Sequence, residues 1–180
     1  MVESRVVDTN VLIVASAADD GSPFRPDATP VEEAQLREIV LKWFQNFERD
    51  AKRYIVLDHH WLILTEYGNK LNVDQDYAYL AMMAKQDRGE VLWVGFEVDP
   101  HGHAVLPVHL ANSVTDRADR KMVAAALSAL NSGNACKLTN ACDSDWLDCT
   151  QVLKDYGVEV EQLLEEWLLQ QKLKKNKNCE

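Results

Sequence analysis

The sequence predicts an α/β protein in which helices cover both faces of a mostly parallel sheet. Short runs of β-branched and apolar residues alternate along the chain with longer segments whose apolar residues recur every three or four positions. This alternation is typical of parallel strands joined by helical crossovers. At 180 residues, one such domain can bury its own core without disulfides or structural zinc. We therefore expect a three-layer α/β/α sandwich.

The amino-terminal half of the chain contains two expected strands, at residues 5–8 and 54–57. Between them, residues 16–30 hold three of the five prolines and are expected to form a long loop. Residues 31–50 carry apolar side chains at helical spacing and predict an amphipathic helix. Two further helices are expected over residues 60–71 and 75–86.

An inserted β-hairpin is expected near residues 91–107, because strand-type residues flank the turn Asp99-Pro100-His101-Gly102. The alternation of helix and strand then continues. The expected elements are a helix over 116–131, a strand over 135–139, a helix over 146–156, an edge strand over 158–160 and a helix over 162–172. We divide the chain into a single domain, residues 1–172, and a flexible basic tail, residues 173–180.

The charge balance restricts the kinds of partner. Nineteen Lys and Arg against 29 Asp and Glu give a net charge of −10, which argues against a non-specific nucleic-acid binder with a broad basic face. Four cysteines without metal-ligand spacing favour a reduced, intracellular chain. No apolar run approaches the about 20 residues of a membrane span, and the first residues lack the regions of a signal peptide. We expect a cytoplasmic protein without a membrane partner.

Several carboxylates are expected to converge where the parallel strands end and the helices begin. Asp8 follows the first strand, Asp116 and Asp119 open a later helix, and Asp143 and Asp145 follow the strand over 135–139. Acids at these positions face the same edge of a parallel sheet. Carboxylates gathered in one cleft repel each other, and a hard cation such as Mg²⁺ or Mn²⁺ is the usual reason for such an arrangement.

Each acid also has an explanation that involves no ligand. Asp8 could cap a helix that begins at Val11. The pair Asp116 and Asp119 has the three-residue spacing of a capping arrangement. Glu66, in the helix over 60–71, could pair with the lysine four residues later on an exposed helix face. The acids after the strand over 135–139 could belong to a solvated loop.

In their order and context, these acids resemble the PIN-domain family. The resemblance rests on three segments: Val6-Val7-Asp8-Thr9-Asn10-Val11-Leu12-Ile13, Asp116-Arg-Ala-Asp119-Arg-Lys-Met-Val-Ala-Ala-Ala126 and Leu138-Thr139-Asn140-Ala-Cys-Asp143-Ser-Asp145-Trp146. It spans about residues 5–160, and Glu66 is carried over by its place on the helix after the second strand. The inserted hairpin and the additional helices make this chain longer than the compact toxin members of the family.

The resemblance implies a metal-dependent nuclease, and more specifically an endoribonuclease that hydrolyses single-stranded RNA. Asp8, Glu66, Asp119 and Asp143 would be its catalytic acids and would hold one or two Mg²⁺ or Mn²⁺ ions. Asp116 and Asp145 would be supporting acids that could share that role. A bound cation would activate a water molecule and neutralise charge on the phosphate, so no Ser or His nucleophile is needed.

Polar and basic neighbours of the acids are candidates for supporting roles. Hydrogen-bonding groups that could orient the carboxylates are Thr9, Asn10, Thr139 and Asn140. Basic residues that could contact substrate phosphates, or simply form a solvated helix face, are Arg117, Arg120 and Lys121. The five tryptophans are expected in the core, with Trp93 and Phe96 on the hairpin as the candidates to face RNA or a protein partner.

Two other functions remain open from the sequence. One is a non-catalytic PIN-like module that binds protein or RNA. The other is the toxin component of a toxin–antitoxin pair, with an antitoxin as its partner. A homo-oligomer is also compatible with the sequence. A phosphatase of the haloacid dehalogenase type is disfavoured, because Asp8-Thr9-Asn10 lacks a second Asp two residues after the first.

Overall fold

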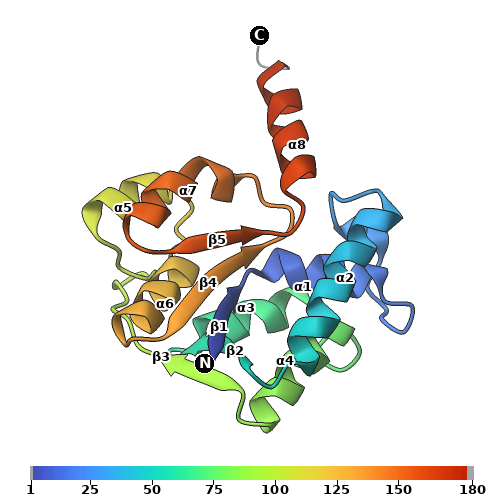
Figure 1. Ribbon diagram of the computed structural model, residues 1–180, viewed down its shortest axis with the longest axis horizontal. Coiled ribbons are helices and arrows are strands. Elements are labelled where there is room, and N and C mark those ends of the chain that lie inside the picture. The colour runs from blue at the N-terminus through green and yellow to red at the C-terminus, as the bar shows by residue number, and fades with distance from the viewer. Residues whose placement is uncertain (1, 178–180) are drawn as a thin grey trace.

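A five-stranded parallel sheet forms the centre of the computed structural model, which describes residues 2–177 (Figure 1). The strand order is β3-β2-β1-β4-β5, and each neighbouring pair is parallel. The strands are β1 Glu3–Val7, β2 Arg53–Asp58, β3 Val91–Val94, β4 Ala135–Asn140 and β5 Glu159–Gln162. The α/β class and the mostly parallel sheet expected from the sequence are confirmed.

Helices cover both faces of this sheet, which gives the expected three layers. Helices α1 to α4 pack together on one face, while α5, α6 and α7 lie on the other, and α8 extends away from the body (Figure 1). The helices are α1 Thr9–Ala18, a 3₁₀ turn η1 Pro26–Ala28, α2 Ala34–Arg49, α3 Leu62–Lys70, α4 Tyr77–Asp87, α5 Val108–Ser113, α6 Arg120–Asn131, α7 Asp145–Asp155 and α8 Glu165–Lys177. No helix among residues 2–177 has the length and apolar character needed to cross a membrane.

The core sits on both sides of β1, the central strand. Val6 and Val7 are fully buried, one toward each helical layer, as expected for a strand covered on both faces. On one side α1 packs against α2. On the other side α6 contacts β1, β2, β3 and β4, and it includes the small buried residues Ala124, Ala125 and Ala126. Both layers therefore fix the carboxyl end of β1.

The insertion near residues 91–107 differs from the expected hairpin. Residues 91–94 form β3, which pairs in parallel with β2 instead of turning back on the residues that follow. A smaller antiparallel loop remains around the predicted turn, with a bridge between Val98 and Ala104 and a hydrogen bond from Asp99 N to His103 O of 2.8 Å. Strand-type residues indicate a strand but not its partner. Helix α4 precedes β3 and places it beside β2, and this placement decides which strand β3 pairs with.

The carboxyl-terminal helix is longer than expected, and α5 was not expected at all. Helix α8 continues to Lys177, past the boundary that the sequence suggests at residue 172. Lys172 forms an ion pair with Asp148 of α7, and Lys175 Nζ donates to Ser144 Oγ at 3.0 Å. The segment expected as a tail therefore begins as a helix that contacts α7. Residues 178–180 of that segment lie outside the described residues.

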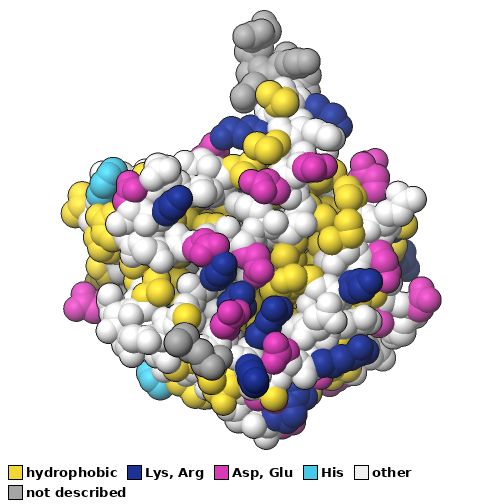
Figure 2. All heavy atoms as spheres, in the orientation of Figure 1, with side chains coloured by type: hydrophobic (Ala, Val, Ile, Leu, Met, Phe, Trp, Pro, Cys, Tyr) yellow, Lys and Arg dark blue, Asp and Glu magenta, His cyan; other side chains and the backbone are white. Residues whose placement is uncertain are grey.

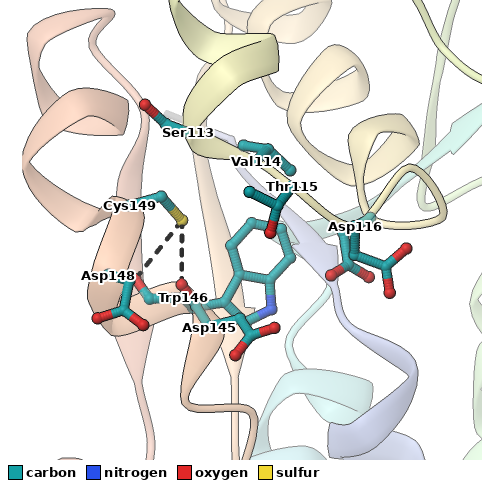
Figure 3. A pocket seen from close by; sticks show the side chains of 9 residues that line it. Ser113, Val114, Thr115, Asp116, Asp145, Trp146, Asp148 and Cys149 are labelled. Atoms are coloured by element: carbon teal, nitrogen blue, oxygen red, sulfur yellow. Dashed lines mark hydrogen bonds between the residues drawn. The ribbon is translucent and has the colours of Figure 1, made fainter.

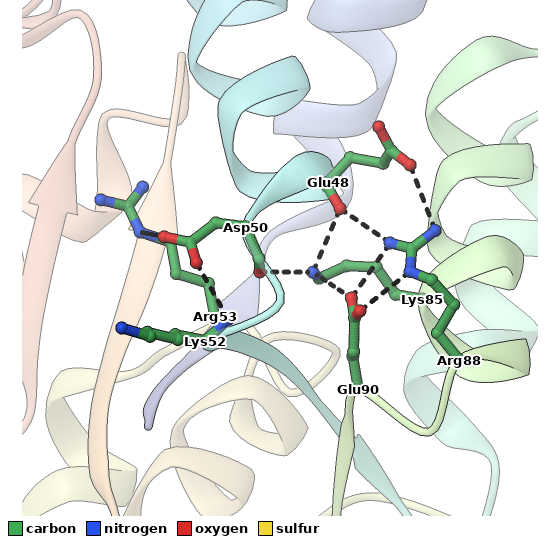
Figure 4. Close-up of polar contacts among 7 residues, drawn as sticks. All are labelled: Glu48, Asp50, Lys52, Arg53, Lys85, Arg88 and Glu90. Carbon is green, nitrogen blue, oxygen red and sulfur yellow. Dashed lines mark hydrogen bonds and ion pairs between the residues drawn. The ribbon is translucent and has the colours of Figure 1, made fainter. Parts of the chain in front are cut away.

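A buried ion-pair network holds the amino edge of the sheet, opposite the edge where the acids gather (Figure 4). Lys85 is fully buried, and its Nζ donates to Glu90 Oε2 at 2.8 Å and to the carbonyl of Asp50 at 3.2 Å. Arg88 binds the same Glu90 carboxylate with Nε at 2.9 Å. These donors hold the pKa of Glu90 at about 2, chiefly through the Arg88 hydrogen bond. The network joins the end of α2 to the start of β3.

Candidate functional site

The strand order changes direction beside β1, and this places a crevice at the carboxyl ends of β1 and β4. The chain proceeds from β1 outward to β2 and β3, and then returns to the opposite side of β1 to form β4. In open parallel sheets, ligands bind outside the carboxyl ends of the strands at such a switch point. Asp8 follows β1 directly and Asp143 follows β4, so both acids lie where a ligand site is expected.

Asp8 is held by hydrogen bonds to both of its carboxylate oxygens. Its Oδ1 accepts from the backbone N–H of Asn10 at 2.9 Å and so caps α1, as one reading of the sequence proposed. Its Oδ2 accepts from Nε1 of the buried Trp146 at 2.7 Å. Asp8 is only 6% exposed. A helix cap and an indole from α7 therefore fix the orientation of one carboxylate.

Burial raises the pKa of Asp8 to about 6. The hydrogen bonds from Asn10 and Trp146 oppose this increase, while the charges of Asp143 and Glu66 add to it. Both acids therefore lie close enough to Asp8 to influence its ionisation.

Asp119 stands at the amino end of α6, but its side chain makes no capping hydrogen bond. Helix α6 begins at Arg120, so the expected helical turn from residue 116 is instead a non-helical turn, in which Asp116 Oδ1 accepts from the N–H of Ala118 at 2.7 Å. Burial, followed by the charges of Asp8, Asp116 and Asp143, raises the pKa of Asp119 to about 8. Capping therefore does not account for Asp119.

A cavity of about 210 Å³ adjoins these acids (Figure 3). Its acidic lining comes from two elements, with Asp116 and Asp119 before α6 and Asp145 and Asp148 on α7. The ring of Trp146 forms part of the same wall, and its indole nitrogen points toward the side on which Asp116 and Asp145 lie. The cavity is therefore polar on one side and could admit a small charged group.

Asp143 is held in a network that also joins β1 to β4. Asn10 Nδ2 donates to Asn140 Oδ1 at 2.8 Å, and the same oxygen accepts from the N–H of Asp143 at 3.1 Å. Asp143 Oδ1 accepts from the N–H of Asp145 at 2.9 Å. Burial, with repulsion from Asp145, raises the pKa of Asp143. Asn10 and Asn140 therefore position the loop that carries Asp143, rather than contacting its carboxylate.

The other two polar candidates differ from each other. Thr9 donates a hydrogen bond to Glu66, in keeping with an orienting role. Thr139 Oγ1 instead donates to Glu161 Oε2 at 3.0 Å, on β5. The side chain of Thr139 therefore does not orient the candidate acids, although its backbone carbonyl accepts from the N–H of Asp8 at 3.0 Å.

Glu66 pairs with Lys121, one of the basic residues considered for substrate binding. This ion pair joins α3 to α6 across the carboxyl edge of the sheet. Among residues 2–177 Glu66 makes no ion pair with Lys70, so the surface-pair explanation is wrong. Lys121 is only 8% exposed and also donates to the carbonyl of Ala118. Its ammonium therefore neutralises Glu66 from within the fold.

Of the three basic candidates, only Arg117 is exposed and makes no side-chain hydrogen bond or ion pair among residues 2–177. Arg120 donates from Nη2 to the carbonyl of Ala111 at 2.7 Å and from Nε to that of Val114 at 3.2 Å, which ties down the end of α5. Lys121 is paired with Glu66. Arg117 is exposed beside a second, smaller cavity. Of the three, Arg117 is the best placed to contact a phosphate.

The carboxylate oxygens at this edge suit a hard divalent cation, but the side chains do not yet surround a single ion position. In the part of the chain from residue 2 to residue 177, no three His, Cys, Asp or Glu side chains stand close enough together to hold one ion. However, Asp8 is buried and Asp119 and Asp143 are half-buried oxygen donors, the charge of Asp143 raises the pKa of both other acids, and a cation would relieve that repulsion. An ion bound by Glu66 as well would have to displace Lys121.

The sequence did not reveal the contact between Trp146 and Asp8. A buried indole N–H requires an acceptor, and the nearest acidic segments in the sequence are those beside Trp146 itself. Its true acceptor lies 138 residues away. The sequence also did not reveal Asp58, whose carboxylate caps α3 by accepting from the N–H groups of Leu62 and Ile63 at 3.0 and 2.9 Å. The first contact depends on the order of the strands, whereas the second is local, between residues four and five positions apart.

No protein-family model matches this chain, and neither the curated proteins nor the solved structures compared with it include a match.

Proposed function

We propose that this protein is a PIN-like, Mg²⁺- or Mn²⁺-dependent nuclease that hydrolyses phosphodiester bonds in single-stranded RNA. The observation that carries the proposal is the group of acids at the switch point between β1 and β4, with Asp8 buried and Asp119 and Asp143 half-buried. Asp8 and Asp119 come from different elements, yet the charges of Asp8, Asp116 and Asp143 raise the pKa of Asp119, and the charges of Asp143 and Glu66 raise that of Asp8. Buried like charges are costly unless a cation or a proton compensates them.

In this proposal the acids have different roles. Asp8 is oriented in advance by Asn10 and Trp146, and would hold the cation with Asp119 and Asp143. Glu66 would join them when Lys121 moves away. When bound, the cation would lower the pKa of a water molecule and neutralise charge developing on the phosphate. The carboxylates would fix the position of the cation, and the packed core would exclude bulk water from beneath Asp8.

RNA as the substrate rests on the resemblance to the PIN-domain family. The charge of the chain restricts how RNA could bind. On the face drawn in Figure 2, Lys and Arg side chains are interspersed with Asp and Glu and form no broad basic surface. A net charge of −10 also disfavours extensive contact with phosphates. We therefore expect contacts confined to the rim of the crevice, with Arg117 as the best-placed cation.

A cleavage assay with matched variants tests this proposal. Purified protein with Mn²⁺ should cut labelled single-stranded RNA, and chelation should abolish the cutting. Asp8→Asn and Asp119→Asn should each lose more than the about 10- to 100-fold expected for residues that only support a ligand. The control is Asp155→Asn, an exposed acid at the far end of α7, which should retain full activity. Full activity in both site variants would contradict the proposal.

One observation favours a second candidate, a non-catalytic PIN-like module that binds protein or RNA. Lys121 already neutralises Glu66, and within residues 2–177 the side chains do not form a closed ligand set. A module of this kind needs no ion. Calorimetric titration separates the two candidates: no heat from Mn²⁺ at millimolar concentration, together with specific capture of a partner, would favour the module.

A further inference from the structure

An exposed aromatic cluster lies at the carboxyl edge of β2 and β3, beside the acidic crevice. Trp61 is 51% exposed, although the sequence suggested a core position. The ring of Trp93 supports it, with the two centroids 5.4 Å apart and the planes at 51°. His59 stacks on Trp93 at 6.1 Å with the planes at 13°. Trp93 is therefore covered by its neighbours, while Trp61 presents its ring to solvent.

Trp61 also has a backbone conformation that is unusual for a bulky residue. Its φ is +62°, and it is the one non-glycine residue of the described chain with positive φ. Bulky residues rarely adopt this conformation, and such outliers tend to occur at functional sites. Glycine would adopt this backbone conformation with less strain. Because half of the Trp61 side chain is exposed, packing alone does not account for a tryptophan at this position.

The cluster lies at the same edge of the sheet as the acidic crevice. Helix α3 begins immediately after Trp61 and carries Glu66, which places the two about 7.5 Å apart along the helix axis. A cavity of about 160 Å³ lies beside the start of α3 and is lined by Leu62, Arg117 and Lys121. Lys121 is the ion-pair partner of Glu66. Leu62, next to Trp61, and Arg117 therefore line one cavity, and Asp116, next to Arg117, lines the acidic one, so a single extended strand could pass from the tryptophan to the acids.

We infer that Trp61, supported by Trp93, is a stacking platform for an unpaired base of the RNA, and that Arg117 contacts a phosphate between this base and the acids. The inference rests on the proposed nuclease function and assigns a base-binding subsite to it. Stacking provides affinity without positive charge, and every base offers a π face. A protein with a net charge of −10 has particular need of such contacts, because counterion release can contribute little.

Binding of RNA in the absence of metal tests the platform separately from catalysis. A fluorescent single-stranded oligouridylate is titrated with full-length protein in EDTA, and anisotropy is measured. Trp61→Gly removes the ring and also suits the positive φ, so the fold should be retained. Trp61→Phe keeps a stacking face. Tyr156→Ala is the matched control, since Tyr156 is another exposed aromatic residue, 38% exposed, at the end of α7.

We expect Trp61→Gly to weaken binding by about 5- to 100-fold, the range for one stacked base, with Trp61→Phe closer to the wild-type protein. Tyr156→Ala should bind as the wild-type protein does, and an abasic strand of equal charge should bind the wild-type protein more weakly. Equal affinity of Trp61→Gly and the wild-type protein would overturn the inference, as would failure of the wild-type protein to bind the oligonucleotide.

The outcome for the platform is distinguishable from the outcome for the nuclease. Trp61→Gly should lose affinity for the oligonucleotide in EDTA, whereas Asp8→Asn should lose Mn²⁺-dependent cleavage. If cleavage is present but Trp61→Gly binds normally, the platform is wrong and the nuclease stands. If stacking is present but no Mn²⁺-dependent cleavage occurs, the nuclease is wrong and the base-binding platform stands.

Discussion

Individual carboxylates at the switch point differ in how firmly the fold holds them. Asp8 accepts two hydrogen bonds, one from the backbone of α1 and one from Trp146. Asp119 occupies a capping position without forming a capping hydrogen bond, and burial among acids raises its pKa to about 8. Asp8 is therefore oriented in advance, whereas Asp119 is available to a proton or a cation.

Removing the indole donor tests the role of Trp146 as a positioning residue. In Trp146→Phe the Asp8 carboxylate loses a hydrogen bond that lowers its pKa, so the pKa of Asp8 should rise further above about 6. Mn²⁺ affinity should fall by roughly 10-fold, as for other groups that orient a ligand. Carboxyl NMR titration and calorimetry measure the two effects. Unchanged values for both would contradict this role, and Trp167→Phe, a buried tryptophan of α8, is the control.

Replacing Lys121 distinguishes an internal counter-ion from a substrate contact. Because the Lys121 ammonium pairs with Glu66, it should compete with a divalent ion for that carboxylate. Lys121→Met should therefore bind Mn²⁺ more tightly, by about fivefold if the pair is worth roughly 1 kcal/mol. Calorimetric titration measures this change, with the exposed Lys154→Met as the control. Weaker Mn²⁺ binding in Lys121→Met would show that the ammonium does not compete.

At the scale of elements, the two edges of the sheet are specialised differently. The carboxyl edge gathers acids with raised pKa values, while the amino edge neutralises its acid completely through Lys85 and Arg88. Because Lys85 also donates to the carbonyl of Asp50, it joins α2, α4 and the start of β3. We assign stability to the amino edge and chemistry to the carboxyl edge.

This division predicts that Lys85→Met destabilises the protein without disturbing the site. Loss of one partner from a buried ion pair costs about 3 kcal/mol, so Tm should fall by roughly 6 to 12 °C. Mn²⁺ affinity below the transition should be unchanged, because Lys85 lies at the opposite edge. Thermal unfolding and calorimetry provide both readings. The exposed neighbour Lys52→Met should change Tm little, and an equal loss there would argue against the buried pair as the cause.

The sequence predicted the elements whose signals are local and missed the features that depend on pairing. Helical spacing over residues 31–50 and apolar runs at 54–57 identified α2 and β2, because each pattern lies within one element. The strand that pairs with β3 is decided by the position of helix α4, which lies between β2 and β3 in the chain, and the residue composition of β3 does not show this. For the site, position after a strand was enough to select Asp8 and Asp143. Trp146, whose acceptor is distant in sequence, required the fold.

At the scale of the whole molecule, the acids behind the net charge of −10 divide into a surface excess and the partly buried group at the switch point. The surface excess disfavours broad binding of nucleic acid. The acids at the switch point make stability depend on pH, because the pKa values of Asp8 and Asp119, about 6 and about 8, lie above the 3.8 of the unfolded chain. The folded protein therefore retains protons that the unfolded chain has lost.

The direction of the pH dependence follows from these raised pKa values. Between about pH 5 and pH 8 the metal-free protein should lose stability as pH rises, as Asp8 and then Asp119 ionise. Glu90, with a pKa of about 2, acts in the opposite direction only at lower pH. Mn²⁺ should raise Tm more at pH 8 than at pH 5.5, because it competes with bound protons. Thermal unfolding in EDTA and in Mn²⁺ measures both trends, and Asp119→Asn should flatten them. A Mn²⁺ effect that is independent of pH would contradict the account.

The central claim is that the acids at the switch point between β1 and β4 hold a divalent cation. Anomalous diffraction from a crystal soaked in millimolar Mn²⁺ at about pH 8 tests it most directly. We predict an anomalous peak within bonding distance of carboxylate oxygens of Asp8, Asp119 and Asp143, with Lys121 moved away from Glu66 if that acid also ligates. A map with Lys121 still on Glu66 and no peak among the three aspartates would contradict the account.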